Sequence, residues 1–122
     1  MRLLLDTHAF LWQVAGKEQL PASTRKLIAA ADEVVLSVAS VWEAEIKRAA
    51  GRLEAPAMVE AAARAGVRLL AITAEHATQA AQLPVHHRDP FDRLLVAQAQ
   101  AESLVLVTKD AILGRYGIAV AW

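Results

Sequence analysis

The chain has 122 residues, of which 56% are hydrophobic and 21% charged, a composition that argues against a disordered segment and contains no run long enough to span a membrane. It contains no cysteine, which excludes disulfides and thiolate metal sites and fits a cytoplasmic protein. Thirteen basic residues balance thirteen acidic ones, so any binding of nucleic acid must come from a local basic patch.

The first predicted element is a short strand in which three leucines at residues 3–5 lead directly to Asp6. Such an apolar run indicates a strand buried on both faces, as in a parallel sheet. Ligands of open α/β sheets bind at the carboxyl ends of the strands, which places Asp6 for chemistry. Asp6 equally suits the cap of the helix that follows, and this stretch alone does not decide between the two roles.

The rest of the chain alternates between predicted helices and short apolar strands. We expect helices over residues 8–15, 21–31, 37–50, 56–65, 73–82 and 90–103, with a short one through Leu113. Strands are expected at residues 34–36, 67–72, 104–107 and 118–120. The alternation predicts a single domain over residues 1–122, with a three-layer α/β/α architecture and a mostly parallel central sheet of four or five strands.

The helix at residues 37–50 carries the next candidate acid. Helical spacing predicts that its inward stripe consists of Val38, Val41, Trp42, Ile46 and Ala49. Glu43 lies at the border of this stripe, one turn before Lys47, where it can line a cleft. Glu45 is a rival for that position, and a surface pair between Glu43 and Lys47 also fits the spacing.

Further aspartates stand at comparable positions later in the chain. Pro90 at a first helical position makes Asp89 the expected cap, and Asp92 then falls on the first turn, where the helix dipole favours its charge. Because the rest of that helix is apolar nearly all round, a lone buried Asp92 would be costly without a function. Asp110 follows the fourth buried strand, on the same face as Thr108, and could also serve as a helix cap.

If Asp6, Glu43, Asp92 and Asp110 lie close together in the fold, four neighbouring carboxylates indicate a particular chemistry. Clustered carboxylates cannot all stay ionised without a counter-charge, and their mutual repulsion raises their pKa values. Hard oxygen ligands without cysteine favour Mg²⁺ or Mn²⁺ over zinc. Acidic sites that hold such ions serve phosphoryl and phosphodiester chemistry, because the ions bind phosphate oxygens, activate water and stabilise the leaving oxygen.

Four motifs spread over the whole chain resemble those of PIN-domain proteins, and within them most closely the VapC-type toxins of type II toxin–antitoxin pairs. They are Leu-Leu-Asp-Thr-His, Ser-Val-Trp-Glu-Ala-Glu-Ile-Lys, Asp-Pro-Phe-Asp-Arg-Leu-Leu-Val-Ala-Gln-Ala and Val-Thr-Lys-Asp. The resemblance implies a Mg²⁺- or Mn²⁺-dependent endoribonuclease that acts on RNA, is held inactive by a cognate antitoxin and is commonly a homodimer.

The resemblance also implies roles for individual residues. It places the catalytic and metal-binding quartet on Asp6, Glu43, Asp92 and Asp110, with Asp89 as an accessory acid. Through their hydroxyls, Thr7 and Thr108 would support ligands or metal-bound water. Glu45 stands where a small residue is expected, so an auxiliary role for it stays open.

Contacts to RNA must come from basic residues near these acids. Arg88, Arg93, Lys109 and Arg115 flank them in sequence and could engage phosphates, and Lys47 is placed to orient Glu43. No aromatic series indicates base stacking. We expect His8, His86 and His87 to be solvated rather than catalytic.

Other families fit the residues less well. A haloacid-dehalogenase-like phosphatase needs an aspartate where His8 stands, and a receiver domain would place adjacent acids near the first strand. A dinucleotide-binding domain would need a Gly-x-Gly-x-x-Gly loop, which is missing. The alternative that stays open is a PIN-like fold retained as a nucleic-acid or protein-binding module, although such a binder gains nothing from clustered, unpaired acids.

Overall fold

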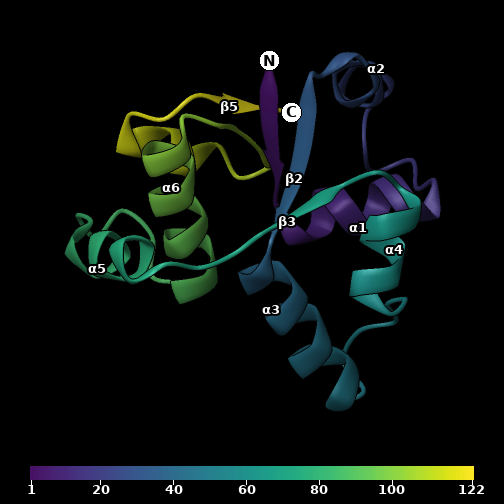
Figure 1. Ribbon diagram of the computed structural model, residues 1–122, viewed down its shortest axis with the longest axis horizontal. Helices are drawn as coiled ribbons and strands as arrows, with labels where there is room; N and C mark the ends of the chain where they lie inside the picture. The colour runs from purple at the N-terminus through teal and green to yellow at the C-terminus, as the bar shows by residue number, and fades with distance from the viewer.

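A five-stranded parallel sheet forms the centre of the structure, a computed structural model that describes residues 1–122 (Figure 1). The strand order is β3-β2-β1-β4-β5, so β1 pairs with both β2 and β4. This confirms the prediction of a mostly parallel sheet, although the last strand begins two residues later than expected. The strands are β1 (Arg2–Leu5), β2 (Glu33–Ser37), β3 (Arg68–Leu70), β4 (Val105–Val107) and β5 (Val120–Ala121).

Helices cover both faces of this sheet. In Figure 1, α5 and α6 lie on one side, α1, α2 and α4 lie on the other, and α3 extends beyond the ends of the strands. None of these helices is long and apolar enough to cross a membrane. The helices are α1 (Thr7–Ala15), α2 (Ala22–Ala30), α3 (Val38–Ala49), α4 (Met58–Arg64), α5 (Ala74–Gln82) and α6 (Pro90–Glu102), and a 3₁₀ helix, η1 (Ala111–Tyr116), stands where the short final helix was expected.

The three leucines of β1 serve both layers of the core. Successive residues of a strand point to opposite faces, so Leu3 and Leu5 pack with Phe10 of α1, while Leu4 packs with Leu95 of α6. All three leucines are fully buried, as the sequence predicted. Burial of each such side chain contributes about 1.5–3 kcal/mol, which fixes β1 at the centre of the sheet.

The predicted inward face of α3 is wrong for most of its residues, since of the five only Val41 packs against the core, and it is half-buried. The structure buries Ala39, Ser40, Glu43 and Ala44, whereas Val38, Trp42 and Ile46 are exposed, Trp42 by 61%. Helical spacing was the right rule, but it was applied to the larger apolar residues. The small side chains on the opposite side let α3 pack closely against its neighbours, and this turns Glu43 inward.

The connection through α5 and α6 brings the chain to the other side of β1, so that β4 lies directly beside it. The backbone N–H of Asp6, just after β1, donates a 3.0 Å hydrogen bond to the carbonyl of Val107 at the end of β4. The residues that follow both strands therefore emerge at one edge. Ligands of open α/β sheets bind at such a reversal of strand order.

Candidate active site

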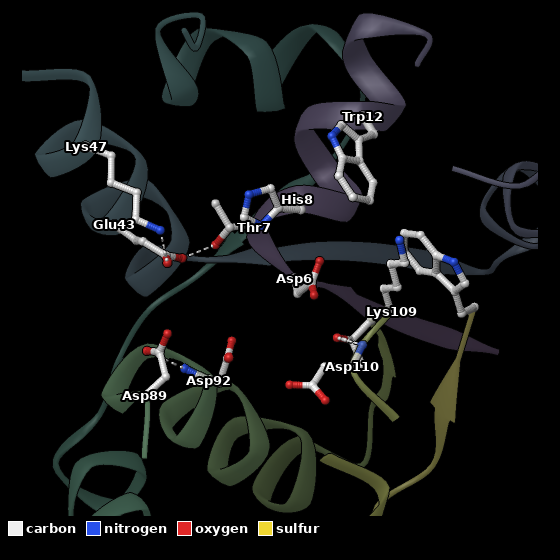
Figure 2. Close-up of a pocket in the computed structure, with 12 residues that line it drawn as sticks. Asp6, Thr7, His8, Trp12, Glu43, Lys47, Asp89, Asp92, Lys109 and Asp110 are labelled. Atoms are coloured by element: carbon white, nitrogen blue, oxygen red, sulfur yellow. Dashed lines mark hydrogen bonds and ion pairs between the residues drawn. The ribbon is translucent and has the colours of Figure 1, made fainter. Parts of the chain in front are cut away.

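A pocket of about 310 Å³ opens at this edge of the sheet (Figure 2). Four separate segments supply the predicted acids that line it, namely Asp6, Glu43, Asp92 and Asp110. Asp89, Thr7, Thr108 and Lys47, which were predicted as accessory, line the same pocket. The remaining residues of its wall are His8, Trp12, Lys109 and Trp122.

Three of the aspartates that line the pocket also cap helices. Asp6 Oδ1 accepts a 2.8 Å hydrogen bond from the N–H of Ala9, and Asp89 Oδ1 accepts one of 2.8 Å from Phe91. Asp110 Oδ1 accepts a 3.2 Å hydrogen bond from the first turn of η1. The capping and pocket-lining roles are therefore compatible, because a cap uses one carboxylate oxygen and leaves the second for other contacts.

Glu43 enters the pocket from the second turn of α3 with both of its oxygens engaged. Its Oε1 accepts a 2.6 Å hydrogen bond from the Thr7 hydroxyl, and its Oε2 lies 2.9 Å from the Lys47 ammonium. Glu45 instead pairs at 3.3 Å with Arg48 on the outer surface and does not line the pocket. Of the two glutamates, Glu43 is the one that the structure brings to the other acids.

Asp92 and Asp6 are carboxyl groups that resist ionisation in this pocket. Burial raises the pKa of Asp92 to about 7, with further increases from the charges of Asp89, Asp6 and Glu43, while His87 lowers it. Burial also raises the pKa of Asp6, against hydrogen bonds from Ala9 and Thr108 that lower it. The predicted repulsion between acids therefore contributes, but burial is the larger cause.

The donor set of the pocket fits a hard divalent cation. Its ligating atoms are carboxylate oxygens supported by threonine hydroxyls, with no thiolate available anywhere in the chain. A cation bound here would offset the cost of ionising Asp92 and Asp6, since an opposite charge nearby favours the ionised form. Asp92 and Asp110, with His87, offer ligand atoms that all lie within 4.8 Å of one another, and Asp6 faces the same pocket, whereas Glu43 is already paired with Lys47.

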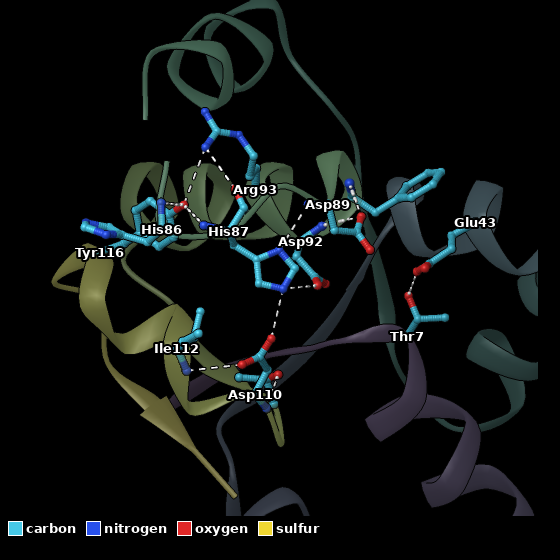
Figure 3. Close-up of polar contacts among 12 residues, drawn as sticks. Thr7, Glu43, His86, His87, Asp89, Asp92, Arg93, Asp110, Ile112 and Tyr116 are labelled. Carbon is cyan, nitrogen blue, oxygen red and sulfur yellow. Dashed lines mark hydrogen bonds and ion pairs between the residues drawn. The ribbon is translucent and has the colours of Figure 1, made fainter. Parts of the chain in front are cut away.

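His87 contacts two of the acids, contrary to the expectation that it is solvated (Figure 3). Its Nε2 lies 3.0 Å from Oδ2 of Asp110 and 3.5 Å from Oδ2 of Asp92. The backbone N–H of Asp89 donates to its Nδ1 at 3.1 Å, so this hydrogen-bond network assigns the ring hydrogen to Nε2. The Nε2 side of the His87 ring therefore lies between the carboxylates of Asp92 and Asp110. His86, by contrast, packs against the Tyr116 ring at 4.9 Å.

Arg93 holds the loop that carries His87, which corrects its predicted role in RNA binding. Its guanidinium extends away from the acids in Figure 3 and does not line the pocket. The Tyr116 hydroxyl supports the same loop by accepting a 2.9 Å hydrogen bond from the N–H of His87. The guanidinium donates to the backbone carbonyls of Ala80, Leu83, Pro84 and His87 at 2.9–3.3 Å.

The other predicted RNA contacts divide into two groups. Lys109 lines the pocket beside Asp110, whereas Arg88 and Arg115 are exposed outside it. Sequence reasoning also missed two aromatic residues, since Trp12 and Trp122 lie in the pocket wall although they are far apart in the chain. The only signal for Trp12 was its position one helical turn after His8, and Trp122 gave none until the strand order was known.

Comparison with known proteins agrees with the family that the sequence motifs resemble. The family model of the PIN domain matches residues 3–119. Ribonuclease VapC22 of Mycobacterium tuberculosis is 33% identical to this chain over 113 residues, which cover 88% of this chain and 86% of the relative.

Solved structures share the fold over almost the full length. A toxin–antitoxin complex from Klebsiella pneumoniae has a TM-score of 0.70 at 16% identity, with coverage of 98% of this chain and 96% of that one. VapBC2 from Rickettsia felis, bound to a DNA fragment from its promoter, has a TM-score of 0.70 at 14% identity, with coverage of 99% and 98%.

Proposed function

This chain belongs to the PIN-domain family, and on that premise we propose that it is a VapC-type toxin, a Mg²⁺- or Mn²⁺-dependent endoribonuclease. A relative named as a ribonuclease, at 33% identity over most of both chains, supports the activity. We further propose that it acts in the cytoplasm and that a cognate antitoxin holds it inactive. Support for the antitoxin comes from structures of the same fold that are described as toxin–antitoxin complexes.

The observation that carries this proposal is the convergence of Asp6, Glu43, Asp92 and Asp110 in one pocket from four separate segments. Buried carboxyl groups with raised pKa values lower the free energy of unfolding at neutral pH, and groups with strongly shifted pKa values are typical of functional sites. A binding module would gain nothing from this cost, whereas a site for a divalent cation requires such oxygens.

The residues of the pocket have distinct tasks in this proposal. When bound, a Mg²⁺ or Mn²⁺ ion would supply positive charge against the phosphate and would favour the ionisation of a water for attack. Asp6, Asp92 and Asp110 would hold the ion, and His87, whose Nε2 lies 3.0 Å from Asp110 and 3.5 Å from Asp92, would orient these two carboxylates. Thr7 and Lys47 fix the carboxylate of Glu43 toward the pocket, and Lys109 stands at the wall where it can contact a phosphate of the RNA.

Incubation of the purified, antitoxin-free protein with total cellular RNA tests the proposed activity. We expect cleavage with Mg²⁺ or Mn²⁺, none in EDTA, and a loss of about a hundredfold or more in Asp6→Asn or Asp92→Asn, since even supporting residues of metal sites contribute 10–100-fold. Equal cleavage in EDTA would contradict the metal mechanism. Binding of RNA without cleavage under any condition would favour a silent binding module.

We also propose that the protein is a homodimer. The exposed side chains of Val38, Trp42 and Ile46 form an apolar stripe on α3, and the Trp42 ring packs edge-on against Phe91 at 5.5 Å. Contiguous apolar patches of this kind mark interaction surfaces. Light scattering should give the mass of a dimer for the wild type and of a monomer for Trp42→Glu. A monomeric wild type would contradict the proposal.

A further inference from the structure

An aromatic wall stands beside the acids of the pocket. The rings of Trp12 and Trp122 meet edge to face, with centroids 5.8 Å apart and an interplanar angle of 65°. The His8 ring lies 5.5 Å from Trp12 on the same helix face, one turn earlier, and Figure 2 shows both on the same side of the pocket. Each tryptophan is only partly buried, since it packs on the core with one part and lines the pocket with another.

Backbone pairing fixes this wall relative to the acids. Ala121, which precedes Trp122, pairs with Val107 of β4, and its carbonyl accepts a 3.0 Å hydrogen bond from the N–H of Thr108. Trp122 is thereby held next to the segment that carries Lys109 and Asp110. Trp12 is tied to Asp6 in a similar way, because Asp6 caps the helix on which Trp12 lies.

We infer that Trp12 and Trp122, with His8, form a subsite for an unpaired nucleobase of single-stranded RNA, next to the phosphate that the acids would engage. The inference rests on the proposed function. Its chemical basis is that a nucleotide combines a flat π face with a charged phosphate, and this pocket pairs an aromatic wall with a cation at Lys109. Proteins bind unpaired bases by stacking them on aromatic side chains, largely independently of base identity.

The wall also explains how a chain without net positive charge can retain RNA. Of the thirteen basic residues, only Lys47 and Lys109 line the pocket, and Lys47 is already paired with Glu43. Stacking contributes affinity that does not depend on charge. The subsite further predicts a preference for single strands or loops, because a paired base does not offer its face.

A binding experiment distinguishes a Trp122 ring that stacks on a nucleobase from one that only packs within the protein. Asp92→Asn serves as a cleavage-deficient background, in which the affinity for a short, fluorescently labelled single-stranded oligoribonucleotide is measured by anisotropy. We expect Trp122→Leu to weaken binding about tenfold, within the range known for loss of one stacked base, and Trp122→Phe to stay within about threefold of the background protein. An abasic ribose-phosphate oligomer should bind weakly and equally to all three.

The other outcomes are equally decisive. Unchanged affinity in Trp122→Leu, or equal losses in Trp122→Leu and Trp122→Phe, would overturn the subsite and leave the proposed nuclease intact, provided that the wild type cleaves RNA. Thermal melts identify a variant that fails to fold, and Trp12→Leu with Trp12→Phe then provides the same comparison. A wild type that neither binds nor cleaves RNA would overturn both the subsite and the proposed function.

Discussion

The pocket holds its carboxylates in two different ways at its two ends. At the α3 end, the two oxygens of Glu43 are occupied by the hydroxyl of Thr7 and the ammonium of Lys47. At the β4 end, the Nε2 atom of His87 lies between Asp92 and Asp110, at 3.5 and 3.0 Å from their carboxylate oxygens, and burial raises the pKa of Asp92 to about 7. At the α3 end the carboxylate already has a lysine partner, whereas at the β4 end the side chain between the two carboxylates is a histidine.

This difference suggests that the carboxylate at the α3 end shapes the pocket, whereas those nearer the β4 end bind the cation. Because Thr7 and Lys47 hold the two oxygens of Glu43, this side chain keeps its orientation without any ligand and shapes the pocket in advance. Asp92 and Asp6 gain most from a cation, because burial penalises their ionised forms. We therefore expect removal of Glu43 to disturb geometry and removal of Asp6 or Asp92 to disturb metal binding.

The largest effect among these comparisons should come from Glu43 at the α3 end. Glu43→Gln leaves Lys47 without its partner and should lower RNA cleavage by about a hundredfold, at the upper end of the range for residues that support a metal site. Glu45→Gln is the matched control, since it changes an exposed pair with Arg48 that contributes little. Single-turnover cleavage rates measure both. An inactive Glu45→Gln beside an active Glu43→Gln would mean that the assignment on this helix is wrong.

Thermal melting should show whether Asp6 belongs to the metal site. Mn²⁺ at a hundred times its dissociation constant should stabilise the wild type by about 2.7 kcal/mol relative to EDTA. Asp6→Asn should respond much less, whereas Glu45→Gln should respond like the wild type. An equal response of the wild type and Asp6→Asn would reduce Asp6 to a helix cap and remove it from the metal site.

A smaller loss is expected for the bridge at the β4 end. His87→Ala removes the side chain that lies between Asp92 and Asp110 and should lower cleavage about tenfold, as for other residues that orient metal ligands. His86→Ala is the adjacent control, because its ring packs on Tyr116 outside the pocket. Rates of both variants at saturating Mn²⁺ provide the measurement. Equal rates in the two would leave His87 without a role in orientation.

The sequence predicted the β4 end of the pocket less well than the strands beneath it. The three consecutive leucines of β1 form a local apolar run, and this run alone was enough to predict a strand buried on both faces. A loop conformation brings His87 to the acids, and the order of the strands brings Trp122 beside Trp12 in the pocket wall. No local sequence pattern contains either of these features. Glu43 was found from the family motif, while periodicity gave α3 the wrong buried face because small residues, not large ones, pack against its neighbours.

The last prediction concerns how stability depends on pH at the β4 end. The pKa of Asp92 is about 7 in the folded protein against 3.8 as its ordinary value, so between these values the folded state binds more protons than the unfolded state. The free energy of unfolding must then fall as pH rises through this interval, and it should level off above pH 7. Asp92→Asn removes this contribution, because an amide does not ionise.

In EDTA, Asp92→Asn and wild type should therefore melt most alike near pH 5, and the variant should melt progressively higher toward pH 8. The Asp92 side chain is 26% exposed, so solvent screening limits the gain to about 1 kcal/mol, or roughly 4 °C in melting temperature. Glu45→Gln should follow the wild type across the whole range, since other titrating groups are common to all three proteins. Saturating Mn²⁺ should reverse the order at pH 8, because the cation then stabilises the ionised carboxylate that the variant lacks. A difference between Asp92→Asn and wild type that stays constant from pH 5 to pH 8 would mean that Asp92 ionises normally, and the two ends of the pocket would then be alike.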